Sequence, residues 1–87
     1  MTMNEADVRT WIISYIADFL MIPESDIQAN SIFGDLGLDS ADSIIISGAM
    51  EERFNVEVDA TLFLRNPNID ELIEDLRMSG YLSDQKR

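Results

Sequence analysis

The sequence predicts an all-α fold, a small four-helix bundle with three main helices, a short third helix and a long loop after the first helix. In three segments, apolar residues recur every three or four positions, the spacing of a helix with one buried face. Capping residues precede these segments, and Gly, Asn or Pro follows them. The only strand-like stretch, Val56-Glu57-Val58, is too short for a stable sheet.

The first helix is expected to begin after Asn4, a candidate N-cap, and to end near Met21. Glu5 and Asp7 fall in its first turn, where the helix dipole favours acidic groups. Pro23 disfavours helical geometry in the residue before it. The apolar face consists of Val8, Trp11, Ile12, Tyr15, Ile16 and Phe19. Its aromatic stripe is a possible ligand site, but the spacing favours packing in the core.

Residues 22–38 form a long connection that is too apolar for a flexible linker. Its apolar members are Ile22, Ile27, Ile32, Phe33, Leu36 and Leu38. We expect an ordered loop folded over the bundle, with one helical turn near residues 23–26. Ordered long loops often carry functional residues.

A second long helix is expected from Ser40 to Phe54, followed by Asn55 as a left-handed C-cap. Its expected buried side comprises Ile44, Ile45, Ile46, Ala49, Met50 and Phe54. Three consecutive isoleucines cannot all face one core, so one of them is expected at the surface near Ser40. The alternatives are a broadly buried helix and a patch that binds a partner. Gly48 costs about 1 kcal/mol in helix propensity relative to Ala, which favours close packing or space for a ligand at this position.

The remaining chain predicts a short helix and a final long one. Asp59 is expected to cap the short helix around residues 62–64, and Asn66-Pro67 to end it. The final helix is expected from about Asn68 to Gly80. Its apolar face comprises Ile69, Leu72, Ile73 and Leu76. Residues 81–87 are expected to form a flexible tail, with folding back of the first two left open.

Length and charge restrict the function classes. Eighty-seven residues form one domain, here taken as residues 1–87. The chain has 17 acidic and 6 basic residues, a net charge of −11, which opposes binding to nucleic acid and to anionic membranes and favours partners with basic patches. There is no cysteine, and no basic stretch followed by an apolar core indicates a signal peptide. No apolar run is long enough to span a membrane. We therefore expect a cytoplasmic monomer without a metal site.

One polar motif stands out at the start of the second helix. Ser40 follows Asp39 directly after a loop with two glycines, so its hydroxyl is expected at the positive end of a helix dipole. An isolated Asp-Ser pair usually does no more than cap a helix. The alternative is a phosphate-linked group on the serine, since helix N-termini favour anions. The chain has no histidine and its only lysine is Lys86, so a catalytic serine lacks an activating base and we expect no enzyme activity.

The sequence around this serine resembles the phosphopantetheine attachment region of acyl carrier proteins. The similar stretch is Phe33-x-Asp35-Leu36-Gly37-Leu38-Asp39-Ser40, and the likeness extends from the first helix to about Leu76. It implies that a phosphopantetheinyl transferase attaches 4'-phosphopantetheine from coenzyme A to Ser40 and not to Ser43. The resemblance also implies that acyl or polyketide intermediates are held as thioesters for acyl-transferring or condensing enzymes.

The segment Leu62–Leu72 resembles the corresponding part of polyketide and nonribosomal peptide carriers more than that of fatty-acid carriers. Two positions depart from the family pattern. The family usually has Leu where this chain has Ala41, and fatty-acid carriers have Glu where it has Ile45. Both positions help partners recognise the carrier in that family, so unusual partners are implied.

The resemblance also implies a docking face for basic partner surfaces beside the arm. Its acidic members are Asp35, Asp39, Asp42, Glu51 and Glu52. The alternative is an ordinary solvated face, since exposed charges usually carry no specific role. For the whole protein, the alternatives are a peptidyl or aminoacyl carrier, and an acidic interaction module without a cofactor. A calcium-binding loop is disfavoured because the acidic residues lack EF-hand spacing.

Overall fold

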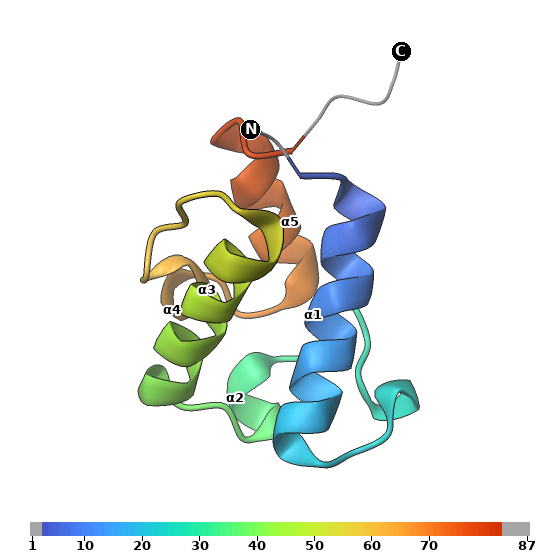
Figure 1. Cartoon of the computed structure of the whole chain (residues 1–87). Coiled ribbons are helices and arrows are strands. Elements are labelled where there is room, and N and C mark those ends of the chain that lie inside the picture. Colours follow the sequence, from blue (N-terminus) through green and yellow to red (C-terminus); the bar gives the residue numbers. More distant parts are fainter. Residues whose placement is uncertain (1–2, 83–87) are drawn as a thin grey trace.

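The computed structural model describes residues 3–82 as a bundle of helices (Figure 1). In chain order the elements are α1 (Glu5–Leu20), the 3₁₀ turn η1 (Glu24–Asp26), α2 (Phe33–Leu36), α3 (Ser40–Phe54), α4 (Leu62–Arg65) and α5 (Ile69–Met78). The chain runs in opposite directions along α1 and α3 (Figure 1). α1 packs most closely against α5, and α3 against α4. The described residues contain no strand, and none of their helices is long and apolar enough to cross a bilayer.

The start of α1 confirms the expected cap. The Asn4 side chain accepts a hydrogen bond from the Asp7 backbone N–H at 3.2 Å. The face of α1 that is fully enclosed consists of Val8, Ile12, Ile16 and Ala17. The prediction that the aromatic stripe belongs to this core face is wrong for Phe19, which is 38% exposed, whereas Trp11 and Tyr15 are half-buried. The buried face is thus rotated toward the aliphatic residues.

α1 ends in a left-handed residue that is not glycine. Met21 has φ 59° and ψ 46°, and its side chain is 90% exposed. The backbone N–H groups of Met21 and Ile22 donate to the carbonyls of Asp18 and Ala17 and so close the helix. A residue with a Cβ carries a steric penalty in this conformation.

Replacing Met21 by glycine is expected to stabilise the domain. Met21→Gly removes the Cβ penalty and should raise the free energy of unfolding by about 1 kcal/mol. For a domain of this size that corresponds to a rise in Tm of roughly 4–8 °C, measurable by thermal unfolding. Met21→Ala is the matched control, because it shortens the same side chain but keeps the Cβ. An equal gain in both variants would contradict this explanation.

The long connection is ordered, as predicted. The helical turn expected near residues 23–26 is present as η1, and Ile27, Phe33 and Leu38 are buried. The short helix α2 within this connection was not predicted. The backbone N–H of Phe33 donates to the carbonyl of Pro67 at 2.8 Å, and its ring lies 5.5 Å from that of Phe63. These contacts across the chain fix a four-residue helix that has little local signal.

α3 spans Ser40 to Phe54, as predicted, and Asn55 forms its left-handed C-cap with φ 57°. One of the three consecutive isoleucines was expected at the surface, but two of them are exposed. Of the three consecutive isoleucines only Ile46 is enclosed, whereas Ile44 is 50% and Ile45 51% exposed. The core side of α3 also includes Ser43 and Ser47, so two small hydroxyl side chains occupy positions where large apolar residues are common.

The last two helices follow the expected order. The prediction that Asp59 caps the short helix is wrong, because the N-cap of α4 is Thr61. Asp59 instead accepts hydrogen bonds from the backbone N–H and the hydroxyl of Thr61. Asn68 caps α5 by accepting from the Glu71 N–H at 2.8 Å. After α5, Gly80 adopts φ 84°. The residues that α5 buries are Ile69, Leu72, Ile73 and Leu76, as the pattern predicted.

The first two residues of the expected tail contact the other end of the described chain. The Met3 N–H donates to the carbonyl of Tyr81 at 2.7 Å, and Met3 pairs with Leu82 in an isolated parallel bridge. Tyr81 and Leu82 are half-buried against the core, so they fold back onto the bundle. Residues 83–87 of the expected tail lie outside the described residues. This contact lies at the opposite end of the bundle from the start of α3 (Figure 1).

A polar network links α4 to α5. Arg65 pairs with Asp75 at 2.9 Å and with Asp59 at 3.0 Å, and the buried Asn66 amide donates to Asp75. Hydrogen bonds from Asn66 and Arg65 lower the pKa of Asp75 below its usual value. Hydrogen bonds from Thr61 and Arg65 lower the pKa of Asp59 to about 2.

These shifts predict a loss of stability in acid. A carboxyl whose pKa is lowered by folding stabilises the fold above its unfolded pKa of about 4 and loses that contribution as the pH falls through its folded pKa. Asp75→Asn should therefore cost about 1–2 kcal/mol at pH 7, and the difference from wild type should shrink between pH 4 and 2. Urea unfolding at pH 7, 4 and 3 measures it. The control is Asp18→Asn, at an exposed position of α1, which should change the free energy of unfolding little at any pH. A difference between Asp75→Asn and wild type that stays constant with pH would contradict this explanation.

Candidate functional site

The candidate site lies where α2 ends and α3 begins. Asp39 is the N-cap of α3, and its carboxylate accepts from the Asp42 N–H at 2.9 Å. The Asp42 carboxylate in turn accepts from the Asp39 N–H at 3.1 Å, which completes a reciprocal capping box. Gly37, at φ 107°, turns the chain between the two helices. These interactions fix the backbone of Ser40, the first residue of α3, in a defined position.

The two serines of this turn have different environments. Ser40 is exposed, and its hydroxyl makes no hydrogen bond within the described residues. Ser43 is only 6% exposed, and its hydroxyl donates to the Asp39 carbonyl at 3.1 Å. A modifying enzyme therefore has access to the Ser40 oxygen, whereas the Ser43 oxygen is enclosed and already engaged.

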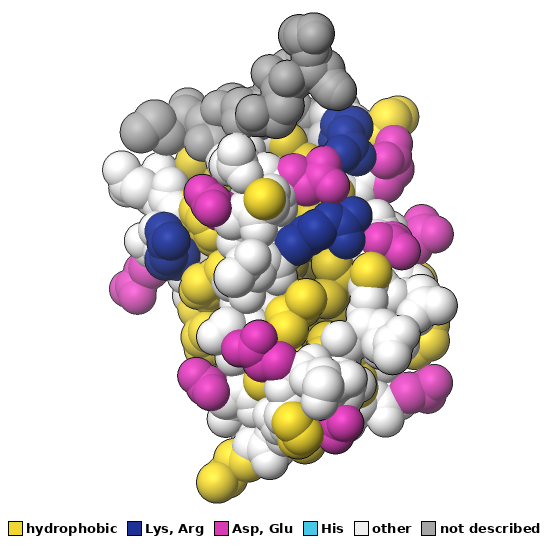
Figure 2. Space-filling model, turned by 90° about the vertical axis from the view of Figure 1, so that its right-hand side faces the viewer, with side chains coloured by type: hydrophobic (Ala, Val, Ile, Leu, Met, Phe, Trp, Pro, Cys, Tyr) yellow, Lys and Arg dark blue, Asp and Glu magenta, His cyan; other side chains and the backbone are white. Residues whose placement is uncertain are grey.

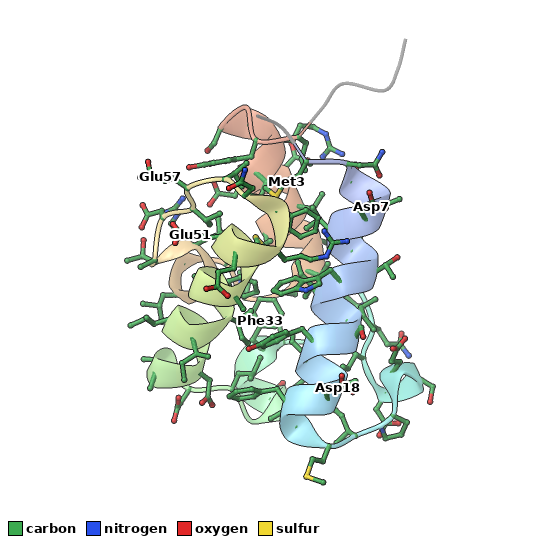
Figure 3. The ribbon with its side chains drawn as sticks, viewed as in Figure 1. Met3, Asp7, Asp18, Phe33, Glu51 and Glu57 are labelled. Carbon is green, nitrogen blue, oxygen red and sulfur yellow. The ribbon has the colours of Figure 1, made fainter. Side chains whose placement is uncertain are left out.

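Ser40 borders an open cleft of about 300 Å³. The cleft lies between α2, the start of α3 and α4. One of the residues that line it, Phe33, lies near the middle of the bundle (Figure 3). Its apolar lining comprises Ile32, Phe33, Leu38, Phe63, Leu64 and Pro67. Buried Asn66 adds an amide, which already donates to the Leu62 carbonyl and to Asp75. A flexible group attached to Ser40 has both an apolar surface and open solvent within reach.

The acidic residues expected to form a docking face divide into two groups. Asp39 and Asp42 are engaged in the capping box, and half-buried Glu51 accepts from the Val58 N–H at 2.8 Å (Figure 3). Asp35 and Glu52 are exposed and make no hydrogen bond through their side chains in the described part of the chain. Three of the five carboxylates therefore stabilise the fold, and only two remain unengaged.

The outer side of α3 carries a largely apolar stripe, which extends the exposed apolar position near Ser40 that the sequence predicted. At 100° per residue, five residues fall within about 100° of one another around the helix. Four of them, Ala41, Ile44, Ile45 and Gly48, form the apolar stripe, and the fifth, Glu52, lies at its acidic border; all five are exposed. A Cβ at Gly48 would meet no atom within 4 Å, so packing inside the molecule does not require glycine there. Two further exposed aliphatic side chains, Leu64 and Ile32, lie at the adjacent cleft.

The carboxylates beside Ser40, Asp39 and Asp42, are engaged in the capping box. The chain contains no histidine or cysteine. Residues 3–82 include no cluster of three or more acidic residues placed to hold a metal ion. What the arrangement offers is an accessible nucleophilic oxygen on a rigid helix terminus, suitable for modification by another protein.

Comparison with known proteins agrees with this geometry. Residues 10–76 match the family model described as "Phosphopantetheine attachment site". A phenolphthiocerol and phthiocerol polyketide synthase protein from Mycobacterium tuberculosis is 29% identical over 69 residues, which is 79% of this chain and 4% of that protein. Polyketide synthase 1 of Metarhizium acridum is 27% identical over 85% of this chain and 3% of its own length. The chain thus corresponds to a small part of these relatives.

Solved structures of similar size share the fold. An acyl carrier protein from Anabaena, with a variant phosphopantetheinylation-site sequence, superposes with a TM-score of 0.76 at 26% identity, covering 91% of this chain and 89% of that one. A free-standing peptidyl carrier protein from Acinetobacter baumannii gives 0.74 at 26% identity, covering 87% and 95%. The predicted helical carrier fold is confirmed. The chain belongs to the phosphopantetheine attachment-site family, a family of non-catalytic carrier proteins.

Proposed function

We propose that Ser40 is the residue that carries 4'-phosphopantetheine. The observation that carries this assignment is the contrast between the exposed, unengaged Ser40 hydroxyl and the enclosed Ser43 hydroxyl. In the modification, the Ser40 oxygen forms a bond to the phosphorus of the pantetheine phosphate and gives up its proton to a base of the transferase, the pyrophosphate bond of coenzyme A breaks, and adenosine 3',5'-bisphosphate leaves. The capping box supports the assignment because it holds the Ser40 backbone rigidly while the side chain stays accessible.

We propose that the chain carries acyl or polyketide intermediates. When bound, the arm supplies a terminal thiol that holds such cargo as a thioester. Similarity to polyketide synthases supports this class of cargo, and similarity to the peptidyl carrier supports the alternative of an aminoacyl or peptidyl cargo. In either case the protein contributes attachment and recognition, while the reactions belong to its partners.

The absence of cysteine provides a direct test of this function. The chain has no thiol of its own, so every thiol that appears after incubation with coenzyme A and a broad-specificity phosphopantetheinyl transferase belongs to the arm. We expect maleimide labelling to rise from none to one per chain, together with the mass of one phosphopantetheinyl group. A folded sample that gains neither, while a known carrier is modified in parallel, would support the interaction module without a cofactor.

We further propose that the transferase and the acyl-transferring or condensing enzymes dock on the exposed stripe of α3 as well as on its acidic border. Ile44 lies one turn from Ser40 on the same side of α3, so a partner that reaches the arm also covers this residue. Asp35 and Glu52 are the unengaged carboxylates available to a basic rim on that partner. With a net charge of −11 opposing self-association, the chain itself is expected to be a monomer.

A further inference from the structure

A second possible interaction surface lies on α1 and the end of α3, away from the outer stripe. Four aromatic rings follow one another there. The rings of Phe54 and Trp11 lie edge to face at 5.9 Å, Trp11 and Tyr15 lie 4.9 Å apart, and Tyr15 and Phe19 are stacked at 6.2 Å. We call these four residues the aromatic ladder. It begins about 20 Å along α3 from Ser40 and continues down α1.

The aromatic ladder is not part of the enclosed core. The residues of α1 that the core encloses are Val8, Ile12, Ile16 and Ala17, whereas Trp11 and Tyr15 are half-buried and Phe19 is 38% exposed. Phe54 is likewise half-buried. The ladder therefore covers the core on one side and offers aromatic surface to solvent on the other. Half-exposed Trp and Tyr are typical of protein interfaces, because they combine a large apolar area with a polar edge.

Arg53, at the Phe54 end of the aromatic ladder, differs from the other arginines that the structure describes. Arg9 binds Glu5 and Asp70, Arg65 binds Asp59 and Asp75, and Arg77 binds Glu5 and Glu74. Of the four arginines among residues 3–82, only Arg53 makes no ion pair. Acidic side chains are nevertheless spread over the neighbouring α1 face (Figure 2). Its guanidinium lies over the Phe54 ring, 4.7 Å from the centroid, and is therefore held at the ladder.

Arg53 also lines a surface hollow of about 290 Å³ with Asp7, Thr10, Trp11 and Ser14. The hydroxyls of Thr10 and Ser14 and the Trp11 indole N–H have no hydrogen-bond partner within the described part of the chain. The hollow thus gathers one unpaired cation and three unengaged donors beside aromatic surface. Asp7 is its one acidic member and lies near the start of α1 (Figure 3).

From this juxtaposition we infer that the hollow and the aromatic ladder bind a segment of a partner protein that presents a carboxylate next to aliphatic side chains. The carboxylate pairs with Arg53, and the aliphatic groups cover Trp11 and Tyr15. This chemistry is opposite to that expected at the α3 stripe, where the unengaged charges are negative. Arg53 lies at the end of α3 remote from Ser40, whereas the ladder continues along α1 toward the end of the bundle where α3 begins (Figure 1).

The test uses a defined probe and the full chain. The probe is a 12-residue helical peptide, capped at both ends, with Leu on one face and Glu flanking it; its control is the same peptide with Gln in place of Glu. Binding is followed by the fluorescence of Trp11, the only tryptophan, and by backbone NMR shifts. We expect the Glu peptide to shift residues 10–19 and 53–54, and to bind at least fivefold more tightly than the Gln peptide despite the overall negative charge of the chain.

Arg53→Gln should remove that preference, whereas Arg53→Lys should retain most of it. Neither change affects the buried core, because Arg53 is exposed. Equal affinity for the two peptides, shifts centred on the α3 stripe, or no binding at millimolar concentration would each overturn the inference. The proposed modification of Ser40 is unaffected by any of these outcomes, since the thiol assay measures it separately in the same variants.

Discussion

Ser40→Ala is expected to abolish phosphopantetheine loading completely, because the alanine has no oxygen to form the bond to phosphorus. Mass spectrometry after incubation with coenzyme A and transferase should show the unmodified mass only, and maleimide labelling should remain at zero in a chain without cysteine. The fold should be almost unchanged, since the Ser40 side chain is exposed and makes no hydrogen bond among the described residues.

Ser43→Ala is the matched control for this prediction. It removes the hydrogen bond to the Asp39 carbonyl and should cost about 1 kcal/mol in unfolding free energy. Loading should nevertheless reach one group per chain, because Ser40 remains. If Ser40→Ala were still modified and Ser43→Ala were not, the assignment of the site would be wrong, and the start of α3 would have to open during modification.

Larger side chains at position 48 are expected to lower partner recognition without lowering the stability of the fold. Gly48→Ala should stabilise α3 by up to about 1 kcal/mol, since glycine is a poor helix former and the position is open. Gly48→Leu should keep much of that stability, yet lower the transferase kcat/KM for modification about tenfold, because its side chain fills the space beside Ile44 and Ile45 where a partner approaches. Ile45→Asp should lower it at least as much, by placing a charge in the apolar contact.

These measurements have a matched control on another helix. Ala6→Leu enlarges an exposed side chain on α1 and should leave kcat/KM unchanged. Charge reversal at Asp35 and Glu52 tests the acidic border without disturbing a cap, whereas reversal at Asp42 or Glu51 also removes a hydrogen bond that holds the backbone. If kcat/KM were unchanged for Gly48→Leu and Ile45→Asp but fell strongly for the charge reversals, the result would support the acidic docking face predicted from the sequence.

Local signals in the sequence predicted most of the helices. α3 and α5 have a polar N-cap and a following Asn or Gly, and these signals depend only on near neighbours in the chain. Helix α2 escaped prediction because Phe33 is held by contacts with Pro67 and Phe63, about thirty residues away along the chain. No local pattern encodes such a partner.

The helical class, the position of Ser40 at a helix start and the resemblance to the carrier family could all be predicted, because each depends on residues close together in the chain. Which surfaces the helices present depends on how they pack against one another. The periodicity of apolar residues could not show which of Ile44, Ile45 and Ile46 is buried. It also could not show that Glu51 binds the Val58 N–H, or that Arg53 pairs with no carboxylate in the part of the chain that the structure describes. Exposure and charge pairing depend on which segments pack together, and that is fixed only when the bundle forms.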